Sequence, residues 1–149
     1  MSDSEMTPDP ARWSLRRLRW AWKIASAGAL ERKSDFDGAL KRLDEAERIG
    51  PLRPSDRVLR ARLLLGCQRI REANQAFVAL RNEFKGSVNP NFQYLRRYCT
   101  YILSSLVPSS GQWAHEATQA NSIDCRPSLK RRFPMTTIDE IHERIQPRD

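Results

Sequence analysis

The sequence predicts an all-α protein, and three observations lead to this prediction. Apolar residues of the same class recur at a fixed interval of about 34 residues, a period typical of stacked pairs of helices. β-Branched residues are scarce, whereas Arg, Leu, Ala and Glu are common, and these four residues favour helix. Gly50-Pro51, Pro54, Gly86 and Pro90 fall between the apolar segments or at their starts, where they separate one expected helix from the next.

The repeat is defined by five positions in each of two units. The first unit has Ala27, Leu30, Phe36, Ala39 and Leu43, and the second has Ala61, Leu64, Ile70, Ala73 and Phe77. Three of the five pairs are identical, and the other two keep the apolar class. Units of this size cannot bury their apolar faces alone, so we expect them to stack into a short solenoid of helical hairpins.

The expected helices follow the repeat in order. Asp9 and Pro10 are typical of an N-cap and a first helical turn. Ser34 is expected to cap the second helix, Gly50-Pro51 to end it, and Gly86 to end the fourth. The predicted helices of the array cover residues 9–32, 35–49, 54–67, 70–85 and 90–106.

The period fails after residue 107, and the rest of the chain is predicted to form a C-terminal cap. Short helices are expected over 112–120 and 138–145, separated by irregular chain over 121–135, where Pro127 and Pro134 fall. The predicted organisation is a disordered polar tail over 1–8, a helical array over 9–107 and a cap with short helices and loops over 108–149.

The pattern of small and large residues resembles that of the tetratricopeptide repeat family, with about two and a half degenerate repeats. Ala61 and Leu64 match the family's first helix, and Ala73 and Phe77 match its second; Pro51 lies where the family often closes a repeat. The first unit matches with Ala27, Leu30, Ala39 and Leu43. The sequence departs from the family at its tryptophan position, which holds Lys23 and Arg57. It also departs at its glycine positions, which hold Ala27, Ser34, Ala61 and Gln68.

The resemblance implies a non-enzymatic scaffold whose first helices line a concave groove for a partner peptide. Arg62 and Arg96, which stand one repeat period apart, are expected to be partly exposed on that groove and to bind an acidic or C-terminal segment through charge-assisted hydrogen bonds. Tyr94 and Tyr98 are expected to be aromatic anchors beside them. Pairing of the two arginines with Glu31 or with backbone carbonyls is the structural alternative.

A second candidate surface lies on the first helix, where cations alternate with tryptophans. The net charge of the chain is +8, which favours an anionic partner. The candidate contacts for RNA, DNA or an anionic membrane are Arg12, Arg16, Arg17, Arg19, Trp20 and Lys23. Alternatively, the tryptophans are buried and the arginine stems cover them. The first helix has two apolar arcs, which suits a helix packed between two neighbours.

No motif for catalysis or metal binding is found. A Gly-rich phosphate loop, a nucleophile elbow and a zinc-protease motif are all missing, and the two histidines lack neighbours at ligand spacing. The three cysteines have no CxxC spacing, which favours a reducing cytoplasm. No apolar stretch reaches the length of ~20 residues that spans a bilayer. We therefore expect no enzymatic activity, no cofactor and no metal.

The function predicted from the sequence is that of a cytoplasmic protein–protein interaction scaffold or adaptor, binding a peptide or acidic segment of another protein. A basic nucleic-acid-binding accessory protein is the first alternative. A structural subunit of a larger complex is the second, and a membrane surface is the least favoured partner. The identity of the partner does not follow from the sequence.

Overall fold

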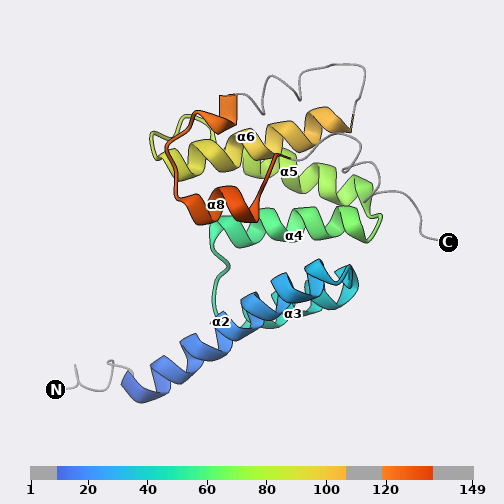
Figure 1. Ribbon diagram of the computed structural model, residues 1–149. Coiled ribbons are helices and arrows are strands. Elements are labelled where there is room, and N and C mark those ends of the chain that lie inside the picture. Colours follow the sequence, from blue (N-terminus) through green and yellow to red (C-terminus); the bar gives the residue numbers. More distant parts are fainter. Residues whose placement is uncertain (1–9, 107–118, 136–149) are drawn as a thin grey trace. The chain divides into compact units, whose positions relative to one another are not determined.

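The computed structural model describes residues 10–106 and 119–135, with side chains from Ser14 onward. All regular secondary structure in these residues is helical, which confirms the predicted all-α fold class. The labelled helices in Figure 1 are α2 (Pro10–Arg32), α3 (Phe36–Ile49), α4 (Pro54–Gly66), α5 (Ile70–Phe84), α6 (Pro90–Ser105) and α8 (Pro127–Arg132). The predicted tail over 1–8, most of the expected helix over 112–120 and the one over 138–145 lie outside the described residues.

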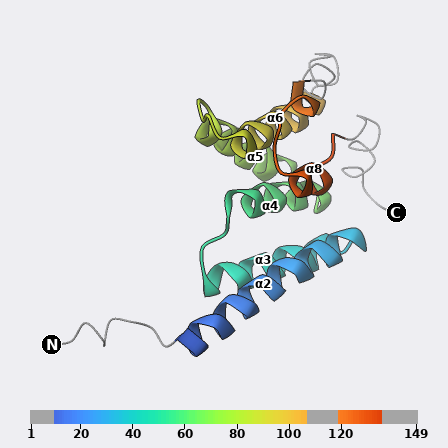
Figure 2. The same ribbon diagram turned by 60° about the vertical axis from the view of Figure 1, so that its left-hand side comes forward.

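The chain divides into two compact units, residues 1–56 and 57–149. Within the first unit α2 pairs with α3, and within the second α5 pairs with α6 (Figures 1 and 2). α4 begins at Pro54 and contributes its residues from Arg57 onward to the second unit. The helical hairpins are thus present, whereas their stacking into a solenoid stays a prediction.

The repeat period is visible in the backbone of two turns. Ser34, between α2 and α3, has a φ of 62°, and Gln68, between α4 and α5, has a φ of 63°. The Ser34 N–H donates to the Glu31 carbonyl and the Gln68 N–H to the Leu65 carbonyl, both at 2.9 Å. These are equivalent left-handed helix ends of the Schellman type.

The next residue completes the same motif in both turns. The Asp35 N–H donates to the Leu30 carbonyl, and the Arg69 N–H donates to the Leu64 carbonyl, again at 2.9 Å. Ser34 and Gln68 both adopt this backbone conformation, although Gly is the residue that adopts it most easily. The expectation that Ser34 caps α3 is wrong, because the Asp35 side chain accepts from the Gly38 N–H at 3.0 Å.

Each second helix buries one stripe of side chains. In α3 the buried residues are Ala39, Leu40, Leu43 and Ala46, and in α5 they are Ala73, Phe77, Leu80 and Phe84. Both stripes have the three- and four-residue spacing of a helix with one apolar face. Ala39 and Ala73, which occupy equivalent positions of the repeat, have no exposed surface.

The second unit is joined by contacts between successive helices. Phe84 of α5 and Phe92 of α6 stack with ring centroids 5.5 Å apart, and Arg57 of α4 pairs with Glu83 of α5 at 2.9 Å. Asn89 caps α6 by accepting from the Asn91 N–H at 2.9 Å. α6 runs through Ile102, which stands one repeat period after Gln68. The periodic turn is therefore absent there, as predicted.

Residues 121–135 differ from the prediction of irregular chain. Pro127 occupies the first turn of α8, where its missing N–H costs no hydrogen bond. The Phe133 N–H donates to the Leu129 carbonyl at 2.9 Å and ends the helix before Pro134. Pro127 and Pro134, which the sequence analysis places in irregular chain, instead begin and follow a short helix.

Candidate functional site

Three of the four predicted groove residues meet on one side of α4 and α6. Arg62 lies on α4, and Tyr94 and Tyr98 lie one turn apart on α6. The Arg62 Nη1 donates to the Tyr98 hydroxyl at 3.2 Å. Both tyrosines are 2% exposed and Arg62 is 8% exposed, so the expectation that Arg62 is partly exposed is wrong.

The chain's own residues 126–133, here called the docked segment, cover these side chains. The Arg62 Nη1 donates to the Arg132 carbonyl at 2.8 Å, and the Tyr94 hydroxyl donates to the Phe133 carbonyl at 2.5 Å. At the other end of the segment, the Arg126 N–H donates to the Asn91 Oδ1 at 3.0 Å. The docked segment is thus bound through its backbone at both ends.

Phe133 is the apolar anchor of the docked segment. Its side chain has no exposed surface, and its ring lies 5.1 Å from the Tyr98 ring, tilted by 57°. The Arg62 guanidinium carbon lies 4.9 Å from the centroid of the Phe133 ring, within the range of a cation–π contact. Arg62 therefore contacts the ring of Phe133 and the carbonyl of the residue before it.

Burial keeps the Tyr94 hydroxyl protonated. Desolvation, with smaller contributions from Cys125 and Tyr98, raises the pKa of the Tyr94 hydroxyl, so the hydroxyl stays neutral and acts as a donor. We call Arg62, Asn91, Tyr94 and Tyr98 the α4–α6 wall. Its donors offer a charged guanidinium and a phenol to backbone carbonyls, and its Asn91 accepts from a backbone N–H.

Arg96, the fourth predicted residue, differs from the others. It is half-buried, and its Nε has no hydrogen-bond partner among the described residues. Sequence reasoning missed Asn91 and Phe133. The signal for Phe133 was an aromatic residue following a Pro-led segment that also holds Leu129, but the segment is too short for a periodic pattern.

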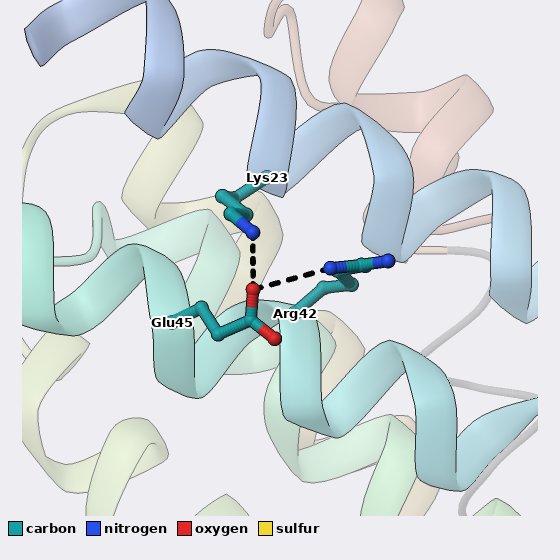
Figure 3. Close-up of polar contacts among 3 residues, drawn as sticks. All are labelled: Lys23, Arg42 and Glu45. Carbon is teal, nitrogen blue, oxygen red and sulfur yellow. Dashed lines mark hydrogen bonds and ion pairs between the residues drawn. The ribbon is translucent and has the colours of Figure 1, made fainter.

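Two cations of α2, Arg16 and Lys23, are engaged within the first hairpin. Lys23 and Arg42 both pair with Glu45 Oε2 (Figure 3), and the hydrogen bond from Lys23 is the main cause that lowers the pKa of Glu45. Arg16 donates through Nε and Nη2 to the Ile49 carbonyl at 2.9 and 2.6 Å. A guanidinium at the last carbonyl of α3 stabilises the negative end of that helix.

Trp20 is also engaged in the first unit. The Arg53 guanidinium carbon lies 5.2 Å from the centroid of the Trp20 ring, and Arg53 in turn pairs with the buried Asp56 at 2.9 Å. Of the remaining predicted contacts, Arg17 and Arg19 are exposed, and the side chain of Arg12 lies outside the described residues. The structure therefore ties Arg16, Trp20 and Lys23 to intramolecular partners.

The two apolar arcs of α2 have different environments. The arc that contains Trp20 and Ile24 faces α3, and Ile24 is 7% exposed. On the other arc, Leu15 is 62%, Leu18 is 65% and Trp22 is 58% exposed. The expectation that both arcs are packed is wrong for this second arc, because α3 covers only the opposite side of the helix.

Metal sites, membrane spans and the buried cysteine Cys99 complete the description. Residues 10–106 and 119–135 contain no cluster of three or more His, Cys, Asp or Glu side chains arranged to bind a metal ion. In the same part of the chain no helix has the length and apolar character needed to cross a membrane. Burial raises the pKa of the Cys99 thiol to about 12, so this cysteine is a packed core residue.

The fold and the site thus define an all-α protein of helical hairpins that binds one of its own segments on the α4–α6 wall. Comparison with known proteins gives no closer assignment, because no protein-family model, curated protein or solved structure matches the chain. The resemblance to the tetratricopeptide repeat family stays a prediction.

Proposed function

We propose that the protein is a non-enzymatic scaffold that binds a peptide segment of a partner protein on the α4–α6 wall. The observation that carries the proposal is that Arg62 and Tyr94 donate hydrogen bonds to the backbone carbonyls of residues 132 and 133. A surface that binds a segment through its backbone has the chemistry to bind a second segment of similar shape. The docked segment is then an internal competitor for the partner.

The contacts indicate what kind of peptide fits. Backbone carbonyls accept from the wall whatever the side chains are, so these hydrogen bonds supply affinity but little selectivity. Selectivity comes from the ring position, where Phe133 lies between Tyr98 and Arg62. A hydrogen bond from a charged donor contributes roughly 1.5–3 kcal/mol. The partner segment is therefore expected to carry an aromatic residue preceded by an accessible carbonyl.

Displacement of the docked segment is energetically plausible for a local change. α8 has no buried residue, and the described contacts of the segment with the wall are made by Phe133 and by hydrogen bonds at its two ends. Such a segment opens at a lower free-energy cost than the core helices. Because it is covalently attached, its effective concentration is high, and a partner must bind more tightly than the segment itself.

The test uses the full-length chain and a labelled peptide of residues 126–135. Phe133→Ala should release the docked segment and increase binding of the labelled peptide relative to wild type. Adding Arg62→Met, which keeps the apolar stem and removes the donor, should reduce that binding again. Arg60→Met on the same helix is the matched control and should leave it unchanged. Circular dichroism checks that each variant stays helical.

Two results would contradict the proposal. Equal peptide binding by wild type and Phe133→Ala would show that the segment does not occupy a peptide site. Equal binding with and without the Arg62 donor would show that the α4–α6 wall is not that site. A partner recovered from cell extract with Phe133→Ala should be lost when Arg62→Met is added.

A specific observation favours a subunit of a larger complex as the second candidate function. Leu15, Leu18 and Trp22 expose more than half of their surface, and exposed apolar patches mark interaction sites. The nucleic-acid alternative is weakened, because Trp20 and Lys23 are engaged within the first hairpin. Salt titration separates the two, since duplex DNA binding falls by roughly 0.9 log units of affinity per log unit of salt for each neutralised phosphate.

A further inference from the structure

The side of α2 that faces away from α3 carries an apolar seam. Its members are Leu15, Leu18, Trp22 and Ala25, all exposed, and we call them the α2 seam. The Trp22 ring is held from one side by its neighbours: Lys23 Nζ lies 5.2 Å and the Arg42 guanidinium carbon 5.5 Å from its centroid. A large aromatic side chain held in place at an exposed site is a typical binding anchor.

The spacing of the seam matches one partner helix. Leu15, Leu18, Trp22 and Ala25 are separated by three, four and three residues, which is the alternation of a and d positions in a heptad. A seam of only a and d positions is narrower than the apolar stripe of ~100° or more that faces a globular core. The seam therefore has the width that a single helix covers.

The two flanks of the seam differ. On one flank Ser14, Ala21 and Gly28 recur every seven residues, and a Cβ added at Gly28 would meet no atom nearer than 3.7 Å. Small residues allow the backbone of a second helix to approach closely. The other flank carries Arg19, which is exposed. In coiled coils, charged residues at the positions beside the a and d seam form salt bridges that determine the choice of partner.

The charge of α2 indicates which kind of partner covers the seam: a helix of another protein, a second copy of α2 or a lipid surface. Between residues 12 and 33 the chain has seven Lys or Arg and one Glu. Arg16 and Lys23 are engaged within the hairpin, whereas Arg19 on the flank of the seam is exposed. A second copy of α2 would bring the same cations against these, and like charges oppose such pairing. A lipid surface needs neither the heptad spacing nor the small flank. We infer that the α2 seam docks an acidic amphipathic helix of a partner protein.

This inference deepens the second candidate function, which rests on the same side chains of α2, and it is independent of the α4–α6 wall, which belongs to the second unit. The experiment uses the full chain and two labelled synthetic helices. One has Leu at its a and d positions and Glu at its flanks, and the other has Lys in place of Glu. The chain variants are Leu18→Glu and Ala21→Arg in α2, with Val88→Glu as the matched control. Val88 is an apolar side chain that is 90% exposed outside the helices.

Fluorescence anisotropy should show saturable binding of the Glu helix and weaker binding of the Lys helix. Leu18→Glu should lower the affinity for the Glu helix at least about tenfold, the usual effect of removing an interface anchor. Val88→Glu should leave it unchanged. Ala21→Arg should lower it as well, because the larger side chain blocks close approach, although it adds a positive charge.

Four results would overturn the inference. The first is no saturable binding of the Glu helix, and the second is equal binding by wild type and Leu18→Glu. The third is binding to vesicles of phosphatidylcholine and phosphatidylserine that Ala21→Arg strengthens, which would assign the seam to a membrane. The fourth is a wild-type dimer in sedimentation equilibrium that Leu18→Glu converts to monomer, which would assign it to a second copy.

Discussion

The first hairpin and the second unit contain the same turn, but their apolar surfaces differ in what covers them. The connection from α2 to α3 and the one from α4 to α5 have equivalent backbone conformations at Ser34 and Gln68. In the second unit the docked segment lies over Arg62, Tyr94 and Tyr98 and buries them. In the first unit the α2 seam stays exposed. The backbone repeat thus does not determine which surfaces remain open.

The comparison teaches that side chains outside the repeat decide the available surface. Phe133 follows a helix of only six residues, yet its ring and carbonyl contact three residues of the wall. The equivalent cover is absent from the α2 seam among the described residues. A repeat period therefore predicts the hairpins, while the binding surface depends on segments that the period does not include.

The largest expected difference between the two regions concerns their aromatic side chains. Phe133→Ala removes a side chain with no exposed surface and should lower the free energy of unfolding by about 3–5 kcal/mol. Trp22→Ala removes a side chain that is 58% exposed and contacts Lys23 and Arg42, so it should cost only about 1 kcal/mol. Urea denaturation measures both. Equal losses would remove the distinction between a covered and an open surface.

The small residues at the hairpin contacts give the next largest effect. Ala39→Leu and Ala73→Leu place a large side chain where no surface is exposed, and each should cost about 1–3 kcal/mol by overpacking. Ala79→Leu, at an exposed position of α5, is the matched control and should have little effect. Wild-type stability in both buried variants would count strongly against equivalent hairpins.

The two left-handed turns should respond alike to Gly. A non-Gly residue in this conformation is strained by roughly 1–2 kcal/mol, and Gly relieves this strain. The greater freedom of Gly in the unfolded chain offsets part of that gain. Ser34→Gly and Gln68→Gly should therefore each stabilise the protein by up to about 1 kcal/mol. Thermal denaturation compares them. A gain in one turn together with a loss in the other would show that the turns are not equivalent.

The smallest effect is the acid dependence of the pair that links α2 to α3. Lys23, and to a lesser extent Arg42, holds the pKa of Glu45 below its ordinary value of 4.5. A carboxylate with a lowered pKa stabilises the fold above the ordinary value, and this contribution disappears as the pH falls through the lowered pKa. Glu45→Gln should therefore be less stable than wild type near neutral pH and approach it below pH 4.5.

The carboxylate of Glu72 provides a control for this test. Arg69 lowers the pKa of Glu72 through a hydrogen bond, but these two residues are three apart in sequence, whereas Lys23 and Glu45 join two helices. Lys23→Met should shrink the acid dependence attributed to Glu45 and leave that of Glu72 unchanged. Denaturation curves at several pH values measure both. An unchanged Glu45 dependence in Lys23→Met would contradict the assigned cause.

Much of the fold could be predicted from the sequence because its signals are local and periodic. The expected helices over 54–67, 70–85 and 90–106 match α4, α5 and α6 to within one residue at each end. The buried Ala39 and Ala73 follow from the period. These features depend on residues a few positions apart, for which helical spacing and Pro or Gly breaks are sufficient guides.

The site was predicted only in part, because it depends on contacts distant in sequence. The sequence predicts that Tyr98 lies beside Arg62, and the hydrogen bond between the two side chains agrees with this proximity. It did not predict that Arg132 and Phe133 cover them, since Arg62 and Arg132 are 70 residues apart and no period relates them. Nor could it tell which arc of α2 pairs with α3, because both arcs are apolar.

The central claim is that the α4–α6 wall binds the chain's own residues 132 and 133. Nuclear magnetic resonance of the full chain tests it directly, through the ring protons of Phe133 and Tyr98, whose ring centroids lie 5.1 Å apart. The account predicts a nuclear Overhauser cross-peak between the two rings in the wild-type chain. A Phe133 ring with random-coil shifts and no cross-peak to Tyr98 would contradict the account.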